Sequence, residues 1–392
     1  MRISGRLREV TSSYTLSLRS EAEKLRKADA SIIDLGSGEP DFATPDNIKE
    51  AARRAIDEGR TRMGGPYGLA DLRNAVVQSY ERSCGTDYRE NEVIITSGAK
   101  NALFSCALSL FNEGDEVVLF SPSWISYAEQ VRIAGAKPVF IRTEQDNRFQ
   151  PDIGKLESVL KPATKAVILN NPANPSGVII SVEELKKIAI LSLQKDFYII
   201  CDECLDHFIY EEGYGSMARF AKKIRDRLII VNAVSETYAM SGWRVGYALG
   251  PKNVIDAMAK VISHDCSQPS SVSQRAALEA MTGPQDFIKQ VIAEYRKKRD
   301  TMFELIWKIK ELSCLRPDGT FYMFPDVTAL LERLKLESTT EFSNHLLKHA
   351  RVITIPGEIF NYPGHVRFSF APPLEAIVEG MRRVEDCLRQ AM

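Results

Sequence analysis

The chain has 392 residues, of which 44% are hydrophobic, so its composition predicts about two or three folded domains and excludes a disordered protein. Lys and Arg total 51 and Asp and Glu total 52, and the resulting net charge of −1 gives no electrostatic reason to expect nucleic acid or an anionic membrane as a partner. The seven Cys are scattered along the chain, which disfavours a disulfide framework and indicates a reducing compartment.

No segment has the pattern of a targeting sequence or a membrane span. Residues 1–27 carry charges throughout and lack the apolar core of a signal peptide. No apolar run approaches the length of about 20 residues that crosses a bilayer. These patterns predict a cytoplasmic protein that does not bind a membrane.

Short β-branched apolar runs alternate with longer segments of helical period over most of the chain. Helices are expected, for example, at 100–110, 182–193 and 274–281. The runs that predict strands are 92–96, 116–120, 137–141, 166–169, 197–201, 228–231 and 245–249. This alternation is typical of a mostly parallel sheet with helices on both faces. Because such sheets bind ligands beyond the carboxyl ends of their strands, we expect the chemistry in the residues that follow each run.

The last third of the chain predicts a second, smaller domain. Residues 284–312 have the apolar stripe of one long helix, and short strands and helices follow it. We therefore expect three parts. They are an N-terminal segment over 1–45 that packs with the small domain, a large α/β domain over 46–284 and a small α+β domain over 285–392.

A Gly-containing turn, Ser97-Gly98-Ala99-Lys100-Asn101, follows the first predicted strand and opens a helix. The free backbone N–H groups and the positive dipole end of such a turn suit a phosphate, although an ordinary helix start has the same pattern. Trp124 follows the second strand. Its indole suits stacking on a flat ring, whereas packing in the core is the alternative interpretation.

Two more strands end in polar residues. Residues 170–177 hold three Asn, including Asn174, and two Pro, which make a stiff turn that displays amide side chains; a plain turn is the alternative. Asp202 ends another buried run and is predicted to meet a cation or a protonated ring nitrogen, because an unpaired buried carboxylate is costly. Cys201 and Cys204 have the spacing of half a zinc site, but no second pair accompanies them, so we expect them to pack in the core.

Two Arg lie in or beside apolar runs. Arg244 directly precedes the run at 245–249, and a buried Arg implies a partner anion. Arg367 lies inside the apolar pattern at 366–370, where a solvated position at a sheet edge is the alternative. The five His form neither a triad nor a metal-binding set, so no metal is predicted.

Taken together, these motifs resemble those of the fold-type-I aminotransferases that bind pyridoxal phosphate, in the class I subgroup near aspartate aminotransferase. The resemblance runs in order along nearly the whole chain and includes 38–45, 317–322 and 356–357. It implies a mostly parallel seven-stranded sheet with helices on both faces plus a smaller α+β domain. It also implies a homodimer with shared active sites, and an amino acid or keto acid as the small-molecule substrate.

The resemblance further implies the roles of individual residues. The substrate α-carboxylate would meet the backbone of Gly38 and the guanidinium of Arg367. Asp202 would keep the ring nitrogen protonated, so that the ring can draw electrons from the substrate α-carbon. The residues that would hold the cofactor are Gly98, Ala99, Lys100, Ser235 and Arg244 at the phosphate, Trp124 at the ring face, Asn174 at the ring hydroxyl and Asp202 at the ring nitrogen.

Three residues depart from the family pattern around the reactive edge of the cofactor. The pattern Ser-Lys-x-Tyr-Ala-Met-x-Gly-Trp-Arg places the Schiff-base Lys at position 236, where this chain has Glu236. Leu205 replaces the Tyr that contacts the ring hydroxyl. Met63 stands where the family has a Tyr in the turn that reaches the neighbouring subunit, and Tyr67, which lies nearby, is a candidate substitute. Because the three changes cluster around the cofactor's reactive edge, the pattern favours natural divergence to lysine-free chemistry over an ordinary aminotransferase inactivated by substitution at 236. The anion-binding residues and Asp202 are kept, which indicates a pocket still shaped for a phosphorylated pyridine or its amino-acid adduct.

Two functional hypotheses follow, and the sequence favours the first. The first is an enzyme that holds pyridoxal or pyridoxamine phosphate non-covalently. In it Glu236 faces the C4′ position, where it pairs with the ammonium of the amine form or acts as a general base at Cα. The second is a non-catalytic pseudoenzyme whose pocket binds a phosphorylated or carboxylated metabolite.

Overall fold

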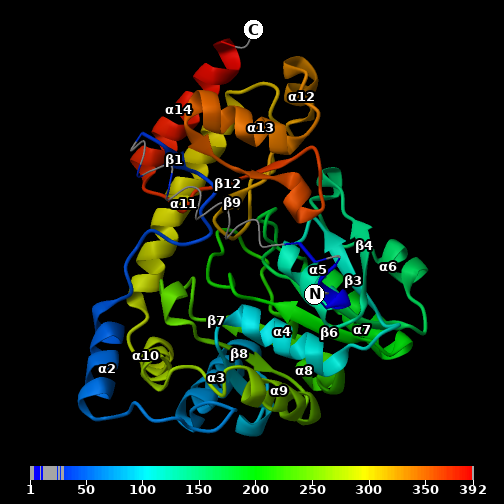
Figure 1. The fold of residues 1–392 in the computed structure, drawn as a ribbon, viewed down its shortest axis with the longest axis vertical. Helices are drawn as coiled ribbons and strands as arrows, with labels where there is room; N and C mark the ends of the chain where they lie inside the picture. Colours follow the sequence, from blue (N-terminus) through cyan, green and yellow to red (C-terminus); the bar gives the residue numbers. More distant parts are fainter. Residues whose placement is uncertain (1–3, 9, 12–23, 25–26, 28–30, 391–392) are drawn as a thin grey trace.

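The computed structural model describes residues 4–8, 10–11, 24, 27 and 31–390 (Figure 1). Its centre is a seven-stranded sheet in the order β2-β8-β7-β6-β5-β3-β4. The strands are β2 (Val93–Thr96), β3 (Glu116–Ser121), β4 (Lys137–Arg142), β5 (Thr164–Asn170), β6 (Tyr198–Asp202), β7 (Leu228–Ala233) and β8 (Gly246–Leu249). Only β8 runs antiparallel to its neighbours. The predicted mostly parallel seven-stranded sheet is confirmed, and each strand overlaps its predicted run.

Helices cover both faces of this sheet because successive side chains of a strand point to opposite faces. Along β6, Ile199 and Cys201 pack in one apolar cluster and Ile200 packs in the other. The first face is covered by α2 (Asp46–Asp57), α3 (Ala70–Cys84), α6 (Ile153–Val159), α7 (Val182–Lys195), α8 (Ala221–Ile224) and α10 (Ser271–Thr282). The second face is covered by α4 (Ala99–Leu110), α5 (Ile125–Ile133) and α9 (Lys252–Asp265). Cys201 is thus a packing residue.

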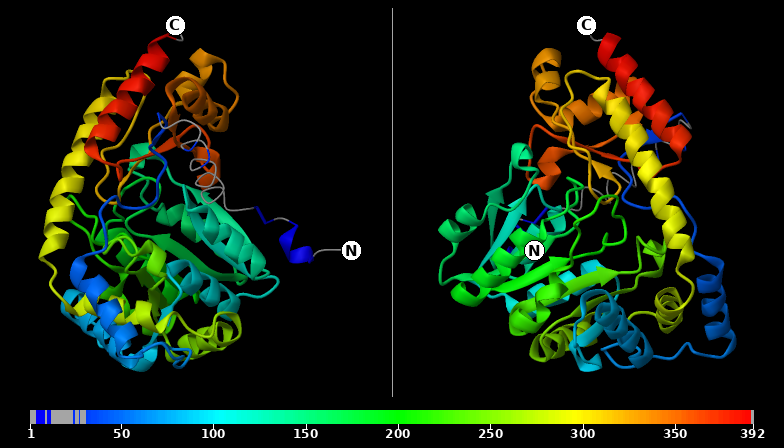
Figure 2. Two further views of the ribbon diagram at one scale, coloured as in Figure 1. Left: turned by 60° about the vertical axis from the view of Figure 1, so that its left-hand side comes forward. Right: turned by 180° about the vertical axis from the view of Figure 1, so that it is seen from behind.

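The helix α11 (Asp286–Trp307) leads away from the large sheet and runs along the outside of the molecule beside α14 (Figure 2). It is shorter than the predicted helix over 284–312. Ile309 and Leu312, which extend the apolar stripe in the sequence, lie in a turn after the helix and pack into the core of the smaller layer.

That smaller layer contains the helices α12 (Thr328–Leu334), α13 (Thr339–His345) and α14 (Leu374–Gln390), with a π-helical turn at Leu346–Ala350. A three-stranded antiparallel sheet has the order β11-β12-β9, formed by Ile355–Pro356, Val366–Ser369 and Tyr322–Met323. A parallel pair joins β1 (Ile33–Asp34) to β10 (Val352–Ile353), so the chain just before the first large-sheet helix lies against the smaller layer. Most of residues 1–30 lie outside the described residues.

Short 3-10 helices complete the described part of the chain. They span Gly5–Leu7, Glu90–Glu92, Gln145–Asn147, Met217–Phe220, Arg225–Arg227, Ser241–Trp243 and Gly357–Phe360. Within the described ranges, no helix has both the length and the apolar character that a bilayer crossing requires.

Candidate active site

The turn after β2 forms a cradle in front of Arg244. Gly98 precedes α4 with φ of 87°, and a Cβ at this position would collide with Nη2 of Arg244. Arg244 is exposed, so the prediction of a buried Arg is wrong; its Nη1 donates to the Ser241 carbonyl at 2.6 Å and its Nη2 donates to the Ser97 carbonyl at 3.3 Å. The first N–H groups of a helix have no intrahelical acceptor, so Ala99 and its neighbours present donors beside a fixed cation.

Lys100, in the first turn of α4, contacts Trp124. The Lys100 Nζ lies 4.8 Å from the centroid of the Trp124 ring, a cation–π distance. Burial lowers the pKa of Lys100, and the positive charge of Arg244 lowers it further. The predicted phosphate residues and the predicted ring-stacking residue are therefore neighbours in space.

Asp202 stands at the carboxyl end of β6 and is only 5% exposed. Its Oδ2 accepts a hydrogen bond from the Tyr127 hydroxyl at 2.8 Å, and its Oδ1 accepts from the Cys204 backbone N–H at 3.1 Å. Burial raises the pKa of this carboxyl, and the hydrogen bonds from Cys204 and Tyr127 oppose the rise. Tyr127 was not identified from the sequence. The sequence signal for it is its position three residues after Trp124, which places the two side chains on the same side of a helix.

Arg367 lies on β12, the central strand of the small sheet, and is 2% exposed. The alternative of a solvated edge position is therefore wrong. Its Nη1 donates to Asn174 Oδ1 at 3.0 Å and its Nη2 donates to the Gly36 carbonyl at 2.9 Å. Its Nε is buried without a hydrogen-bond partner among the described residues. Two of the five guanidinium N–H groups are used in these contacts, so the Nε–H and one N–H on each Nη remain for an incoming anion.

Tyr322 covers the Arg367 guanidinium, whose Cζ is 4.1 Å from the ring centroid. Gly38 borders the same tyrosine, since a Cβ on Gly38 would lie 3.4 Å from the Tyr322 hydroxyl oxygen. The backbone contact to Arg367 comes from Gly36, which sequence reasoning missed because a carbonyl carries no side-chain signal.

Glu236 follows β7 in the segment that also holds the buried Ser235. The side chain of Glu236 is partly exposed, but its Oε2 is buried and finds no hydrogen-bond partner in the described part of the chain. Burial raises its pKa to about 8, and the negative charge of Asp202 adds to the rise, whereas Arg244 opposes it. The charges of both the ring-nitrogen candidate, Asp202, and the phosphate candidate, Arg244, therefore influence the protonation of Glu236.

The other two departures from the family pattern have different surroundings. Leu205 is buried in the apolar cluster of the smaller layer, and its side chain has no polar group. Met63 is 75% exposed in the loop before α3. The Tyr67 hydroxyl donates to Asp256 Oδ1 at 2.9 Å in the same chain, an arrangement that does not favour Tyr67 as the substitute for a residue that serves a neighbouring subunit.

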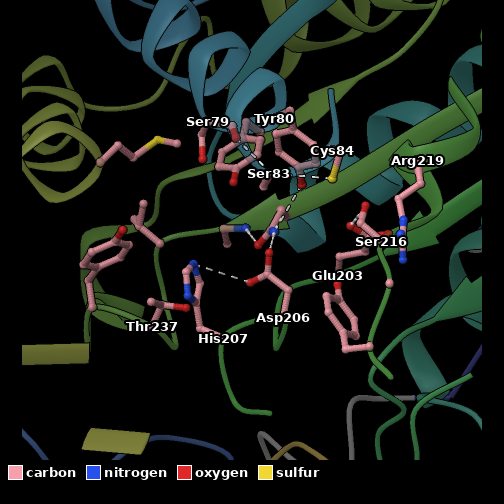
Figure 3. Close-up of a pocket in the computed structure, with 18 residues that line it drawn as sticks. Ser79, Tyr80, Ser83, Cys84, Glu203, Asp206, His207, Ser216, Arg219 and Thr237 are labelled. Atoms are coloured by element: carbon pink, nitrogen blue, oxygen red, sulfur yellow. Dashed lines mark hydrogen bonds and ion pairs between the residues drawn. The ribbon is translucent and has the colours of Figure 1, made fainter. Parts of the chain in front are cut away.

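A separate cavity of about 530 Å³ lies on the other face of β6 and β7 (Figure 3). Glu203 and Asn232 line it, and their strand positions face the α3 side, away from Asp202. Asp206 Oδ2 accepts from Asn232 Nδ2 at 2.9 Å, and the same amide donates to the Tyr80 hydroxyl at 3.3 Å. None of the residues predicted to hold the cofactor or substrate lines this cavity.

The model of the family described as "Aminotransferase class I and II" matches residues 30–384. Aspartate aminotransferase of Geobacillus stearothermophilus is 36% identical to the chain over 385 residues, which cover 98% of each protein. The probable aspartate/prephenate aminotransferase of Thermus aquaticus is 37% identical over 390 residues, or 99% of each. Among solved structures, the aspartate aminotransferase from Thermus thermophilus with maleate matches with a TM-score of 0.94 and 36% identity, covering 99% of this chain and 100% of that one.

The chain therefore belongs to the class I and II aminotransferases, and its fold is the fold-type-I aminotransferase fold. The cofactor of class I aminotransferases of this kind is pyridoxal or pyridoxamine 5′-phosphate. The residues present fit that group. The lack of a Cβ on Gly98 lets the Arg244 guanidinium approach the start of α4, and Arg367 Nε is a buried donor with no partner among the described residues.

Proposed function

We propose that the chain is an aminotransferase-family enzyme with lysine-free chemistry centred on Glu236. In this proposal Glu236 occupies the position of the family's Schiff-base Lys, and the cofactor is held non-covalently. The observation that carries the proposal is the buried, unpartnered Oε2 of Glu236, whose carboxyl is influenced by the charges of Asp202 and Arg244. A buried polar atom without a partner is costly in a folded protein, which favours a ligand as the missing partner.

The candidate residues divide into three groups that match three parts of the ligands. Asp202 pairs with the ring nitrogen, and Arg367 orients the α-carboxylate of the amino acid or keto acid. Arg244 and the start of α4 hold the phosphate charge. The full sets are Gly98, Ala99, Lys100, Ser235 and Arg244 for the phosphate, Trp124, Asn174 and Asp202 for the ring, and Gly38 and Arg367 for the carboxylate.

The bound cofactor supplies an electron sink for charge that develops at the substrate α-carbon. Glu236 supplies the proton-transfer group. With a pKa of about 8, its carboxyl populates both protonation states near neutral pH, as suits a group that accepts and returns a proton at Cα. An ammonium placed against Oε2 lowers this pKa and leaves the carboxylate charged, which favours pyridoxamine phosphate over the aldehyde form.

Titration with the two cofactor forms tests this proposal. Absorbance and Trp fluorescence are followed while the purified protein receives pyridoxamine phosphate or, separately, pyridoxal phosphate. We expect tighter binding of the amine in the wild type, and similar affinities for the two forms in Glu236→Gln, because the amide carries no charge. Equal affinities in the wild type contradict the role of Glu236, and binding of neither form contradicts the cofactor assignment.

Turnover assays separate the enzyme from its alternatives. Amino acids and keto acids are offered together with the cofactor, and we expect turnover in the wild type that Glu236→Gln abolishes while ligand binding persists. Full activity of Glu236→Gln rules out the proposed chemistry. Activity only in Glu236→Lys identifies an ordinary class I aminotransferase inactivated at this position. Cofactor binding without turnover in both the wild type and Glu236→Lys identifies a pseudoenzyme.

We also infer a homodimer with shared active sites. The support is the exposed apolar side chain of Met63, in the loop that reaches a second subunit in related folds. Sedimentation equilibrium measures the mass directly. A dimer is expected, and a monomer at micromolar concentration contradicts the inference.

A further inference from the structure

We propose that Tyr127 is a positioning residue that holds Asp202 in the orientation and charge state required by the pyridine nitrogen of the cofactor. The inference rests on the proposed function, because it concerns the contact between Asp202 and the ring. Its basis is the arrangement of three side chains, Tyr127, Asp202 and Trp124. The Tyr127 hydroxyl donates a hydrogen bond to Asp202, and the Tyr127 ring packs edge-on against the Trp124 ring.

Tyr127 makes the side-chain hydrogen bond to the Asp202 carboxylate. Its hydroxyl donates to Oδ2 at 2.8 Å, while Oδ1 receives the Cys204 backbone N–H at 3.1 Å. Each carboxylate oxygen therefore has one fixed donor, and these two donors set the plane of the carboxylate. One further lone pair on each oxygen remains for the ring N–H.

The position of Tyr127 is itself fixed by packing. The residue is 3% exposed and lies in the apolar cluster formed by α4, α5 and α9. Its ring meets the Trp124 ring edge-on, with centroids 5.3 Å apart and an interplanar angle of 83°. The Tyr127 backbone N–H also donates to the Trp124 carbonyl at 3.1 Å. The first turn of α5 thus presents both the stacking ring and the donor that orients Asp202.

The charge of Asp202 depends on such donors. The carboxyl is buried and also feels the negative charge of Asp206, and both effects favour the protonated form. A donated hydrogen bond favours the ionised form, and only an ionised carboxylate can hold a protonated pyridine. Removal of the Tyr127 hydroxyl therefore weakens the contact to the ring nitrogen and leaves the phosphate contacts in place.

A cofactor analogue without the ring nitrogen isolates this effect. The affinities of pyridoxamine phosphate and 1-deazapyridoxamine phosphate, in which C–H replaces the ring nitrogen, are measured by fluorescence titration. Their ratio reports the Asp202 contact alone. We expect a clear preference for the pyridine in the wild type, no preference in Asp202→Asn, and in Tyr127→Phe a preference lowered about tenfold, as expected for loss of a hydrogen bond to a charged group.

Tyr238→Phe is the matched control, because the Tyr238 hydroxyl also donates a hydrogen bond, to Gln285 Oε1 at 2.9 Å, from a buried ring. It is expected to keep the wild-type ratio. Incorporation of 2,3-difluorotyrosine at position 127 keeps the shape and makes the hydroxyl more acidic, so the ratio is expected to rise. This second variant tests the inference even where Tyr127→Phe folds poorly.

The outcomes distinguish this inference from the proposed function. An unchanged ratio in Tyr127→Phe, or an equal loss of affinity for both ligands, overturns the role of Tyr127 and leaves the cofactor proposal intact. Failure of the wild type to bind either amine overturns the cofactor proposal and this inference together.

Discussion

Two glutamates at the ends of neighbouring strands differ in how their oxygens are satisfied. Glu203 follows β6 and Glu236 lies after β7, and burial raises the pKa of each to about 8. Both oxygens of Glu203 accept hydrogen bonds, from the Met217 N–H at 2.8 Å and the Ser216 hydroxyl at 2.7 Å. Glu236 Oε2 has no such partner among the described residues. A raised pKa alone therefore does not identify a functional acid, and only in Glu236, of these two glutamates, does it accompany an unpartnered oxygen.

The largest effect is expected from Glu203→Leu. The substitution leaves the Met217 N–H and the Ser216 hydroxyl buried without their acceptor, so the free energy of unfolding should fall by about 3 kcal/mol. Urea denaturation followed by circular dichroism measures it. Glu375→Leu, at an exposed site, is the control. If Glu203→Leu lowers the free energy of unfolding by less than this control does, the hydrogen bonds of Glu203 do not stabilise the fold.

The pH dependence of stability is expected to report Glu236 next. Its pKa is about 8 in the folded chain against an ordinary value of 4.5, so the folded state binds the proton more tightly. Stability from this group is fully present below about pH 4.5, is lost as the pH rises through about 8, and is constant above that. The free energy of unfolding of the wild type minus that of Glu236→Gln should therefore decrease from pH 5 to pH 8.5. A constant difference argues against the raised pKa.

Glu236→Leu is expected to act in the direction opposite to Glu203→Leu. It replaces a buried oxygen that has no partner with an apolar group of similar size, which should raise the free energy of unfolding by about 1 kcal/mol. The same variant should lose its preference for pyridoxamine phosphate. Chemical denaturation and cofactor titration on one preparation measure both, and destabilisation would mean that Glu236 has a structural partner in solution.

An effect as small as that of Glu236→Leu is expected from Ser216→Ala. Ser216 donates to Glu203 Oε2 and accepts from the Ala218 N–H at 3.0 Å at the start of a short helix. Loss of this hydroxyl should cost about 1 kcal/mol, as for other helix-capping residues. Thermal unfolding measures it, and the activity of the enzyme should not change, since the residue faces the cavity behind β6.

The sequence predicts the large sheet well because its strands are buried on both faces and so read as continuous apolar runs. Their order across the sheet and the antiparallel direction of β8 depend on crossovers between distant segments, and no local pattern encodes them. The end of α11 was predicted too late because Ile309 and Leu312 continue the helical period although they pack through a turn.

The candidate site is predictable where a charge breaks an apolar run. Asp202 and Arg367 stand out for that reason, and the structure places both in buried polar contacts. Tyr127 and Gly36 do not stand out, because a tyrosine in a helix and a backbone carbonyl have many ordinary roles. Their contacts arise only when α5 and the segment after β1 are brought against the strand ends.

The guanidinium of Arg367 joins segments that are remote in the sequence. It links β12 of the small sheet to Asn174, after β5 of the large sheet, and to Gly36 near the start of the described chain. A carboxylate bound to this guanidinium would therefore contact the one group that joins β12, the turn after β5 and the segment after β1. If Arg367 binds the substrate carboxylate as proposed, occupancy would be coupled to the relative placement of the two sheets, and the distance between them would report ligand binding.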